Sequence, residues 1–174
     1  MILRGYRGAF PRLGERVFLA ETAAVIGDVE LGDDVSVWYA SVVRGDCCWI
    51  RVGARSNIQD NTVIHVSHRH AGLPEGRATR IGEDVTVGHR CILHACIIGN
   101  TCLIGMGSII LDGAVLHDQV LLGAGSLVTE GKELEGGYLW LGQPARRVRP
   151  LTGEELAWLE YSARHYVKLK DDYL

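Results

Sequence analysis

The chain has 174 residues, which is about the length of one domain and enough to bury a substantial core. Hydrophobic residues make up 47% of it, charged residues make up 22%, and the formal net charge is -3. These values exclude a disordered, collagen-like or nucleic-acid-binding chain, and no stretch reaches the roughly 18 apolar residues of a membrane span. We therefore expect a single domain over residues 1–174.

The N-terminal segment and the cysteines indicate the compartment. Residues 1–7 lack the apolar core of roughly 7 to 15 residues that a signal peptide needs. We therefore expect a cytoplasmic protein with no membrane or nucleic-acid partner. The cysteines are odd in number and form no Cys-x-x-Cys pair, which argues against a disulfide framework and against a thiolate zinc site. We expect all of them to be buried free thiols. They are Cys47, Cys48, Cys91, Cys96 and Cys102.

From residue 25 onward, aliphatic residues recur at every sixth position with a few breaks. A fixed period of six over about a hundred residues indicates a repeat architecture. Neither an α-helix nor a simple alternating strand has this period, so we expect hexapeptide rungs of a β-helix over about residues 12–130, with about 18 residues in each three-rung coil. The repeat aliphatic residues are Val25, Leu31, Val37, Val43, Val52, Ile58, Ile64, Ile81, Val87, Leu93, Ile98, Ile104, Ile110, Leu116, Leu122 and Val128.

Two insertions interrupt the period. A small one of three residues surrounds Cys47, and a polar segment punctuated by glycine and proline, at residues 66–80, is expected to form a loop that adds eleven residues. After the repeats, residues 136–150 are expected to form an irregular crossover. A capping box of Thr152 and Glu155 then predicts a C-terminal helix over about residues 152–170. We expect it to pack along the β-helix wall through Leu156, Leu159, Ala163 and Tyr166.

Two histidines occupy equivalent positions in the repeat. His65 and His94 each follow a repeat aliphatic residue directly, so both side chains are expected to point outward. They are 29 residues apart, and subtracting the eleven residues of the loop leaves 18, which is one full coil. The two imidazoles should therefore stack on one face about 5 Å apart, which suits a shared metal ion. The same arithmetic places Arg44 one coil below His65.

A third histidine belongs to a different column. His89 lies two positions after a repeat aliphatic residue, on the preceding face of the β-helix, and Asp60 falls one coil below it with Gln59 alongside. Because this column does not reach the pair on its own chain, we expect a second subunit to bring the columns together. Contact of this head-to-tail kind closes into a ring about a threefold axis. The sequence therefore predicts a homotrimer with a metal ion between subunits, held by His65, His89 and His94.

A metal site with three histidine ligands indicates hydration or hydrolysis chemistry. Zinc held in this way keeps a fourth position for water and lowers the pKa of that water to about 7, which supplies hydroxide at neutral pH. Gln59 is expected to orient this hydroxide, while Asp60, Arg44 and Asp46 support the ligands and the interface. An alternative for Arg44 and Asp46 is a simple interface ion pair. His68 and His70, in the loop, are either proton shuttles or solvated side chains.

The sequence closely resembles the γ-class carbonic anhydrases over nearly its whole length. Hexapeptide-repeat proteins of this kind are left-handed parallel β-helices of triangular section. The resemblance implies a homotrimer, a zinc or ferrous ion, Gln59 and Tyr161 near the metal-bound solvent, and reversible hydration of carbon dioxide to bicarbonate. The best-studied members carry a glutamate where Cys47 stands here and another in the loop as proton shuttle, where this chain offers His68 and His70. The motifs that carry the resemblance are Arg44-Gly45-Asp46, Ser56-Asn57-Ile58-Gln59-Asp60, His65, Gly88-His89 and His94.

Other functions fit the same residues. A metal-activated hydroxide also attacks thioesters, so a thioesterase acting on acyl-CoA-type substrates is one alternative to the zinc lyase. A metal-binding trimer without enzymatic activity is another. Acyl transfer, which the wider hexapeptide-repeat family performs, is less well supported because it needs no site with three histidines.

Overall fold

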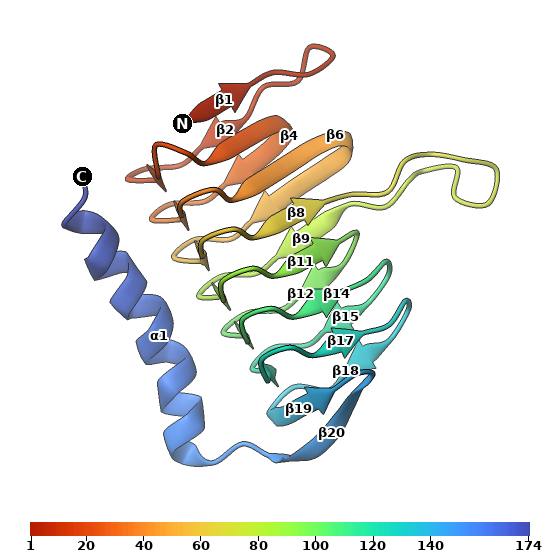
Figure 1. The fold of residues 1–174 in the computed structure, drawn as a ribbon, viewed down its shortest axis with the longest axis vertical. Coiled ribbons are helices and arrows are strands. Elements are labelled where there is room, and N and C mark those ends of the chain that lie inside the picture. The colour runs from red at the N-terminus through yellow and green to blue at the C-terminus, as the bar shows by residue number, and fades with distance from the viewer.

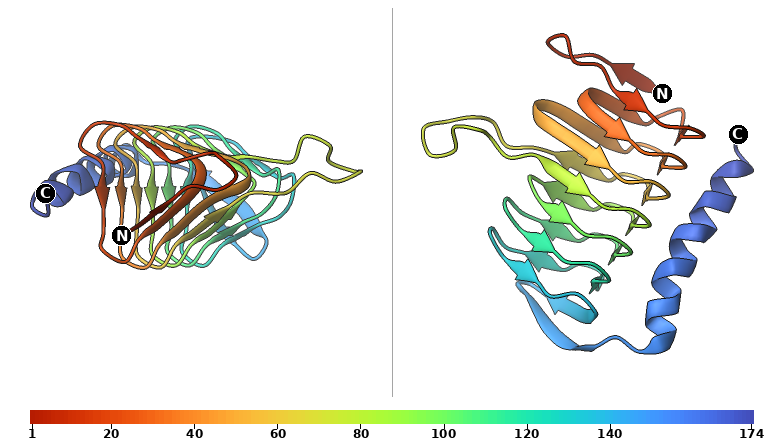
Figure 2. Two further views of the ribbon diagram at one scale, coloured as in Figure 1. Left: turned by 90° about the horizontal axis from the view of Figure 1, so that it is seen from above. Right: turned by 180° about the vertical axis from the view of Figure 1, so that it is seen from behind.

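The computed structural model describes residues 1–174 and consists of a parallel β-helix with one α-helix alongside it (Figure 1). The expected mainly β fold, with hexapeptide rungs and a C-terminal helix, is confirmed. Figures 1 and 2 show the coils stacked along the long axis, a loop projecting outward from the middle of the stack, and the helix running back toward the N-terminal coils. No helix of the structure is long and apolar enough to cross a membrane.

Each coil contributes one short strand to each of three faces. The long strands β4 (Ala24–Leu31) and β6 (Val42–Val52) bend from the first face onto the second, and β1 (Ile2–Arg4) pairs with β4. The first face continues with β8 (Val63–His65), β11 (Ile92–His94), β14 (Ile109–Ile110) and β17 (Leu127–Val128). The second face has β2 (Arg12–Leu13), β9 (Thr79–Ile81), β12 (Ile97–Ile98), β15 (Val115–Leu116) and β18 (Glu133–Leu134). The third face has β3 (Phe18–Leu19), β5 (Ser36–Val37), β7 (Asn57–Ile58), β10 (Thr86–Val87), β13 (Leu103–Ile104), β16 (Leu121–Leu122) and β19 (Tyr138–Gly142), with β20 (Ala145–Pro150) at its end.

The repeat aliphatic residues fill the axis of the β-helix. Each of those named above is at most 3% exposed, which confirms that the six-residue period marks the core. Glycines after these residues permit close stacking at the corners: a Cβ atom on Gly53 would lie 2.5 Å from the carbonyl carbon of Gly82 in the next coil. The backbone therefore approaches itself there more closely than any other residue allows.

The pairing register confirms both insertions. Between β4 and β6 the register passes from Gly27 opposite Gly45 to Val29 opposite Ile50, which is a three-residue insertion in β6. The expectation of five buried thiols is wrong at this insertion, because Cys47 is exposed and Cys48 is half-buried where the chain leaves the repeat. The other three cysteines are buried.

The loop lies where the sequence predicts it, whereas the segment after the repeats differs from its prediction. Between β8 and β9 the chain leaves the β-helix as a loop, closed at its base by an antiparallel bridge of Ser67 with Arg77. The expectation of an irregular crossover over residues 136–150 is wrong: β19 adds to the third face in parallel with β16, and β20 returns antiparallel to it. Pairing of this kind follows no hexapeptide period, so the repeat pattern does not reveal it.

The helix α1 (Gly153–Asp171) begins at the predicted capping box. The Thr152 hydroxyl accepts from the Glu155 amide at 3.2 Å, and the Glu155 carboxylate accepts from the Thr152 amide at 2.9 Å. The helix packs on β5, β7 and β10 of the third face. On its inner side Leu159 and Ala163 are buried, while Leu156 and Tyr166 are partly buried. The helix therefore covers the face on which β10 leads to His89.

Candidate metal centre

His65 and His94 lie side by side on the first face. They end the neighbouring strands β8 and β11 and are paired in register, so the predicted separation of one coil is confirmed. Their ring centroids are 5.2 Å apart, and His65 Nδ1 lies 3.2 Å from His94 Nε2. Both side chains are partly exposed, at 20% and 33%. The repeat thus brings two imidazole nitrogens together at the surface of the β-helix.

A carboxylate contacts the outer nitrogen of each ring. His65 Nε2 is 2.9 Å from Asp46 Oδ1, and His94 Nδ1 is 2.6 Å from Asp112 Oδ1. Burial acts to raise the pKa of Asp46, but hydrogen bonds from His65, Cys47 and Arg44 outweigh it and lower that pKa to about 2. Burial likewise opposes the hydrogen bonds from Ser67 and His94 that lower the pKa of Asp112. Both carboxylates are therefore ionised at neutral pH and only accept hydrogen bonds.

When both imidazoles are neutral, as metal ligands are, the carboxylates determine their tautomers. Because the carboxylates accept protons from His65 Nε2 and His94 Nδ1, the two nitrogens that face each other, His65 Nδ1 and His94 Nε2, both carry lone pairs. Two lone pairs at this distance repel unless a proton or a metal ion lies near both. The two facing nitrogens are therefore placed to bind a cation.

The separation of the facing nitrogens also fits a tetrahedral metal ion. Zinc–nitrogen bonds of about 2.0–2.1 Å at a tetrahedral angle place two ligand nitrogens about 3.3 Å apart. The observed separation of His65 Nδ1 and His94 Nε2 is 3.2 Å. The distance between the two nitrogens therefore matches that between two ligands of a tetrahedral zinc ion.

Asp112 is a functional candidate that the sequence reasoning missed. It lies 18 residues after His94, one coil further along the same column, and its second oxygen accepts from the Ser67 hydroxyl. The arithmetic that paired His65 with His94 also leads to Asp112, so the signal was present in the sequence. An aspartate one coil away from a predicted ligand, in the same column, is the pattern that indicates a residue of this kind.

Arg44 and Asp46 lie at the start of the three-residue insertion. The Arg44 guanidinium donates to Asp46 Oδ2 within the chain, while Asp46 Oδ1 contacts His65. Asp46, Cys47 and His65 form the one group of at least three potential ligand side chains whose ligand atoms all lie within 4.8 Å of one another. The chain alone therefore brings His65 and His94 together but does not add His89 to them.

His89 and Asp60 form a second column at the corner between the third face and the first. His89 Nδ1 lies 2.7 Å from Asp60 Oδ2, as their separation of one coil predicts, and the His89 side chain is 43% exposed. Gln59 beside them is buried and donates from Nε2 to Asn57 Oδ1 at 3.1 Å. Asp60 therefore orients His89 by its Nδ1 atom, which leaves Nε2 free to bind elsewhere.

The remaining predicted residues lie apart from both columns. Tyr161 is half-exposed on α1, where its ring contacts Trp158 and stacks on His165. His68 and His70 are exposed in the loop with ring centroids 5.5 Å apart. None of these three side chains contacts His65, His89 or His94 within one chain, and their roles remain predictions.

The chain is similar to a known protein family and to several named proteins. The model of the family described as bacterial transferase hexapeptide (six repeats) matches residues 95–130. The chain is 54% identical over 173 residues to Protein YrdA of Escherichia coli (strain K12), covering 99% of this chain and 94% of that protein. It is 40% identical over 163 residues to a carbonic anhydrase of Geobacillus kaustophilus, covering 94% and 86% of the two chains. It is 41% identical over 162 residues to the mitochondrial gamma carbonic anhydrase 2 of Arabidopsis thaliana, covering 91% of this chain and 57% of that protein.

Proposed function

Because the chain belongs to the γ-class carbonic anhydrase family of hexapeptide-repeat proteins, we propose that it interconverts carbon dioxide and bicarbonate with the help of a bound divalent metal ion. The observation that carries the proposal is the pair of facing imidazole nitrogens of His65 and His94, 3.2 Å apart, each in a ring whose other nitrogen contacts a carboxylate.

The metal ligands in this proposal come from two subunits. His65 and His94 of one chain bind through the nitrogens that face each other, and His89 of a second chain binds through Nε2. Asp46, Asp112 and Asp60 each hold one of these rings by its other nitrogen. Three such interfaces close a homotrimer, and the exposure of His89 in the single chain supports its use at an interface.

The ion that we propose is zinc, with ferrous iron as the alternative. Such an ion supplies a Lewis acid that lowers the pKa of a coordinated water to about 7, and so provides the nucleophile that carbon dioxide needs at neutral pH.

The chain's own residues orient the nucleophile and remove the proton. Gln59 donates from Nε2 to Asn57, so its Oε1 atom is free to accept from the attacking water and to direct a lone pair toward carbon dioxide. Hydration of carbon dioxide yields bicarbonate and one proton. His68 and His70 carry that proton from the site to bulk buffer through their ring nitrogens, and the Tyr161 hydroxyl donates to the bicarbonate oxygen as it forms.

The test is a stopped-flow hydration assay on protein loaded with zinc or with ferrous iron, with acyl-CoA hydrolysis measured on the same samples. We expect hydration with at least one metal, and its loss in His94→Ala together with the metal. The matched control is His117→Ala, which removes an exposed histidine of the second face that contacts only Glu133. Hydrolysis of acyl-CoA without hydration would replace the proposal with a thioesterase. Stoichiometric metal with neither activity would leave a metal-binding trimer.

A further inference from the structure

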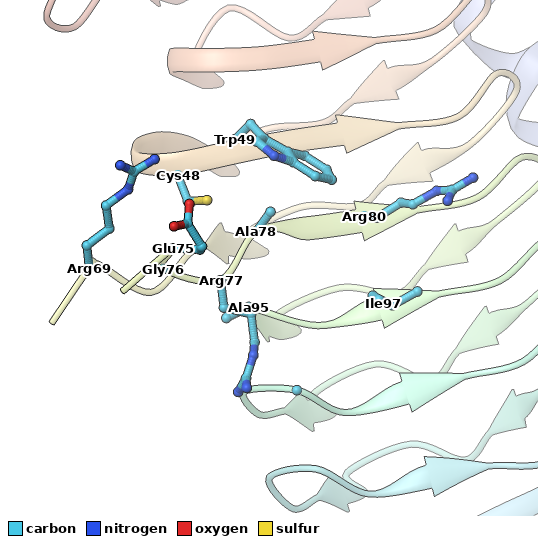
Figure 3. Close-up of a pocket in the computed structure, with 11 residues that line it drawn as sticks. Cys48, Trp49, Arg69, Glu75, Gly76, Arg77, Ala78, Arg80, Ala95 and Ile97 are labelled. Atoms are coloured by element: carbon cyan, nitrogen blue, oxygen red, sulfur yellow. The ribbon is translucent and has the colours of Figure 1, made fainter. Parts of the chain in front are cut away.

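A second site lies on the other side of the corner that follows His94. Beside the base of the projecting loop, a cavity of about 600 Å³ opens on the second face (Figure 3). Three arginines line it, from the loop, from the base of the loop and from β9, together with a single acidic residue. The lining therefore carries a formal charge of about +2 on a chain whose net charge is -3. The charged lining residues are Arg69, Glu75, Arg77 and Arg80.

The pairing register explains why Arg80 has no acidic partner. On the second face, Glu30 lies opposite Arg51 and pairs with it at 3.2 Å, and Arg51 lies opposite Arg80 in the next coil. On its other side Arg80 lies opposite Ile97. Arg80 thus has a like charge below it and an apolar residue above it, and no carboxylate lies within 4 Å of its guanidinium.

Arg77 also makes no ion pair, but for a different reason. Its guanidinium lies against the corner at Gly113, and its charge helps to lower the pKa of Asp112, but no nitrogen of Arg77 lies within 4 Å of an Asp112 oxygen. Both oxygens of Asp112 are already used, by the His94 ring and by the Ser67 hydroxyl. Arg69 in the loop likewise makes no side-chain hydrogen bond or ion pair. The three arginine side chains therefore line one cavity without a side-chain hydrogen bond or ion pair, and Figure 3 shows their guanidinium groups on different sides of it.

The rest of the lining is apolar. Figure 3 shows Trp49 on the coil before that of Arg80 and Ile97 on the coil after it. Trp49 is 39% exposed and Ile97 is 47% exposed, and Arg51 lies 5.2 Å from the Trp49 ring centroid. Large apolar side chains left open beside cationic groups are typical of a pocket for an organic anion.

We propose that this arginine-lined cavity is a binding site for a phosphate-bearing organic anion with a flat aromatic body, of the nucleotide class. Arginine binds phosphate oxygens in a bidentate manner, and a dianion balances the charge of the lining. The volume lies within the range of about 300–1,000 Å³ of small-molecule sites, and Trp49 offers an aromatic surface for the ligand's ring. The site is distinct from the candidate metal centre and needs no metal.

The experiment is titration calorimetry on metal-free full-length protein, with ADP and inorganic pyrophosphate as probes. We expect both to bind, and ADP to bind more tightly because only ADP has a ring to place on Trp49. Arg77→Ala should weaken both probes about tenfold, and the Arg77→Ala/Arg80→Ala double variant about a hundredfold. Arg77→Lys keeps the charge without the fork and should recover only part of the affinity. Trp49→Ala should weaken ADP and leave pyrophosphate unchanged.

The matched control is Arg146→Ala, which removes an exposed arginine of β20 that also has no ion pair but lies outside the cavity. Its affinity for both probes should equal that of the unmodified protein. Equal losses in Arg146→Ala and Arg77→Ala would mean that anions bind by net charge alone and would overturn the site. Absence of binding at about 1 mM of either probe would also overturn it, as would an unaltered affinity in the double variant. Because binding is read without metal or turnover, failure here leaves the proposed carbonic anhydrase activity untouched.

Discussion

The contact between Asp112 and His94 gives the sharpest test of the candidate metal centre. In Asp112→Asn the side chain keeps its shape and one oxygen acceptor but loses its charge. The contact that weakens is short, 2.6 Å from Oδ1 to Nδ1, and Asp112 is only 25% exposed, so solvent screens it little. Removing a carboxylate that orients a metal-bound histidine lowers metal affinity by about 10- to 100-fold, or about 1.4–2.8 kcal/mol.

The structure decides where in that range each variant falls. In Asp112→Asn the amide oxygen of the new side chain would still accept a hydrogen bond from His94 Nδ1, so we expect about a tenfold rise in the zinc Kd. Asp112→Ala leaves Nδ1 with no acceptor and allows the other tautomer, which places a proton on the nitrogen that faces His65. For that variant we expect about a hundredfold rise.

The assay is competition for zinc against a chromophoric chelator at neutral pH, with thermal unfolding measured alongside. Asp118→Asn is the matched control, because Asp118 also accepts from a residue 18 positions earlier, the Asn100 amide at 2.7 Å, but its side chain makes no hydrogen bond to a candidate metal ligand. Its zinc Kd should equal that of the unmodified protein. If Asp112→Asn and Asp112→Ala also keep that value while His94→Ala loses zinc, the orienting role of Asp112 is refuted.

Three further predictions test the rest of the argument. First, His65→Ala and His89→Ala homotrimers should not bind metal normally, but chains of the two variants can be unfolded and refolded together. The mixed trimers should recover at most about one metal site each, because only one interface then holds all three ligands. Verified mixed trimers without metal would contradict a shared site. Replacing His68 and His70 together should lower the kcat of hydration more than it changes KM, and imidazole buffer should restore part of the turnover. Unchanged turnover at low buffer concentration would exclude both histidines as proton shuttles. Lys170 of α1 is fully buried and pairs with Asp34 at 2.9 Å and with the more exposed Asp171 at 2.7 Å. Asp34→Ala removes the more buried of these two carboxylates from a buried ammonium group, whereas Lys170→Met leaves the partly exposed Asp34 paired with Arg16, so Asp34→Ala should lower the Tm more. The hydrogen bond from Lys170 lowers the pKa of Asp34 from its ordinary value of 3.8. The stabilisation from this pair is therefore present above about pH 4 and is lost as the pH falls through the lower pKa of the folded state. If Asp34→Ala and the unmodified protein unfold identically as the pH is lowered, this prediction is contradicted.

The period of six determined most of the architecture in advance. Once the core positions of a β-helix are known, every residue has a face and a coil, because neighbouring coils pair in parallel at a constant separation. That is why the pairing of His65 with His94 and the three-residue insertion in β6 were predictable, and why Asp112 and the Asp60–His89 contact follow from the same arithmetic.

The hairpin of β19 and β20 and the contact of the loop's arginines with the second face were outside this logic. Antiparallel return of β20 onto β19 depends on long-range pairing and not on a repeat, so residues 136–150 carried no periodic signal. The same applies to Arg69 and Arg77, which the loop carries to the second face, where they meet Arg80. No spacing along the chain indicates that these three guanidinium groups share one cavity.

The sequence by itself therefore determined the β-helix and the two histidine columns, because these depend only on a count of residues per coil, and it predicts a second subunit that joins the columns. The tertiary structure decided which ring nitrogens face each other and which carboxylate oxygen contacts each ring. Those features depend on side-chain rotamers and on the packing of neighbouring coils, and a repeat pattern specifies neither. These contacts of Asp46 and Asp112 orient the two rings so that His65 Nδ1 and His94 Nε2 face each other 3.2 Å apart.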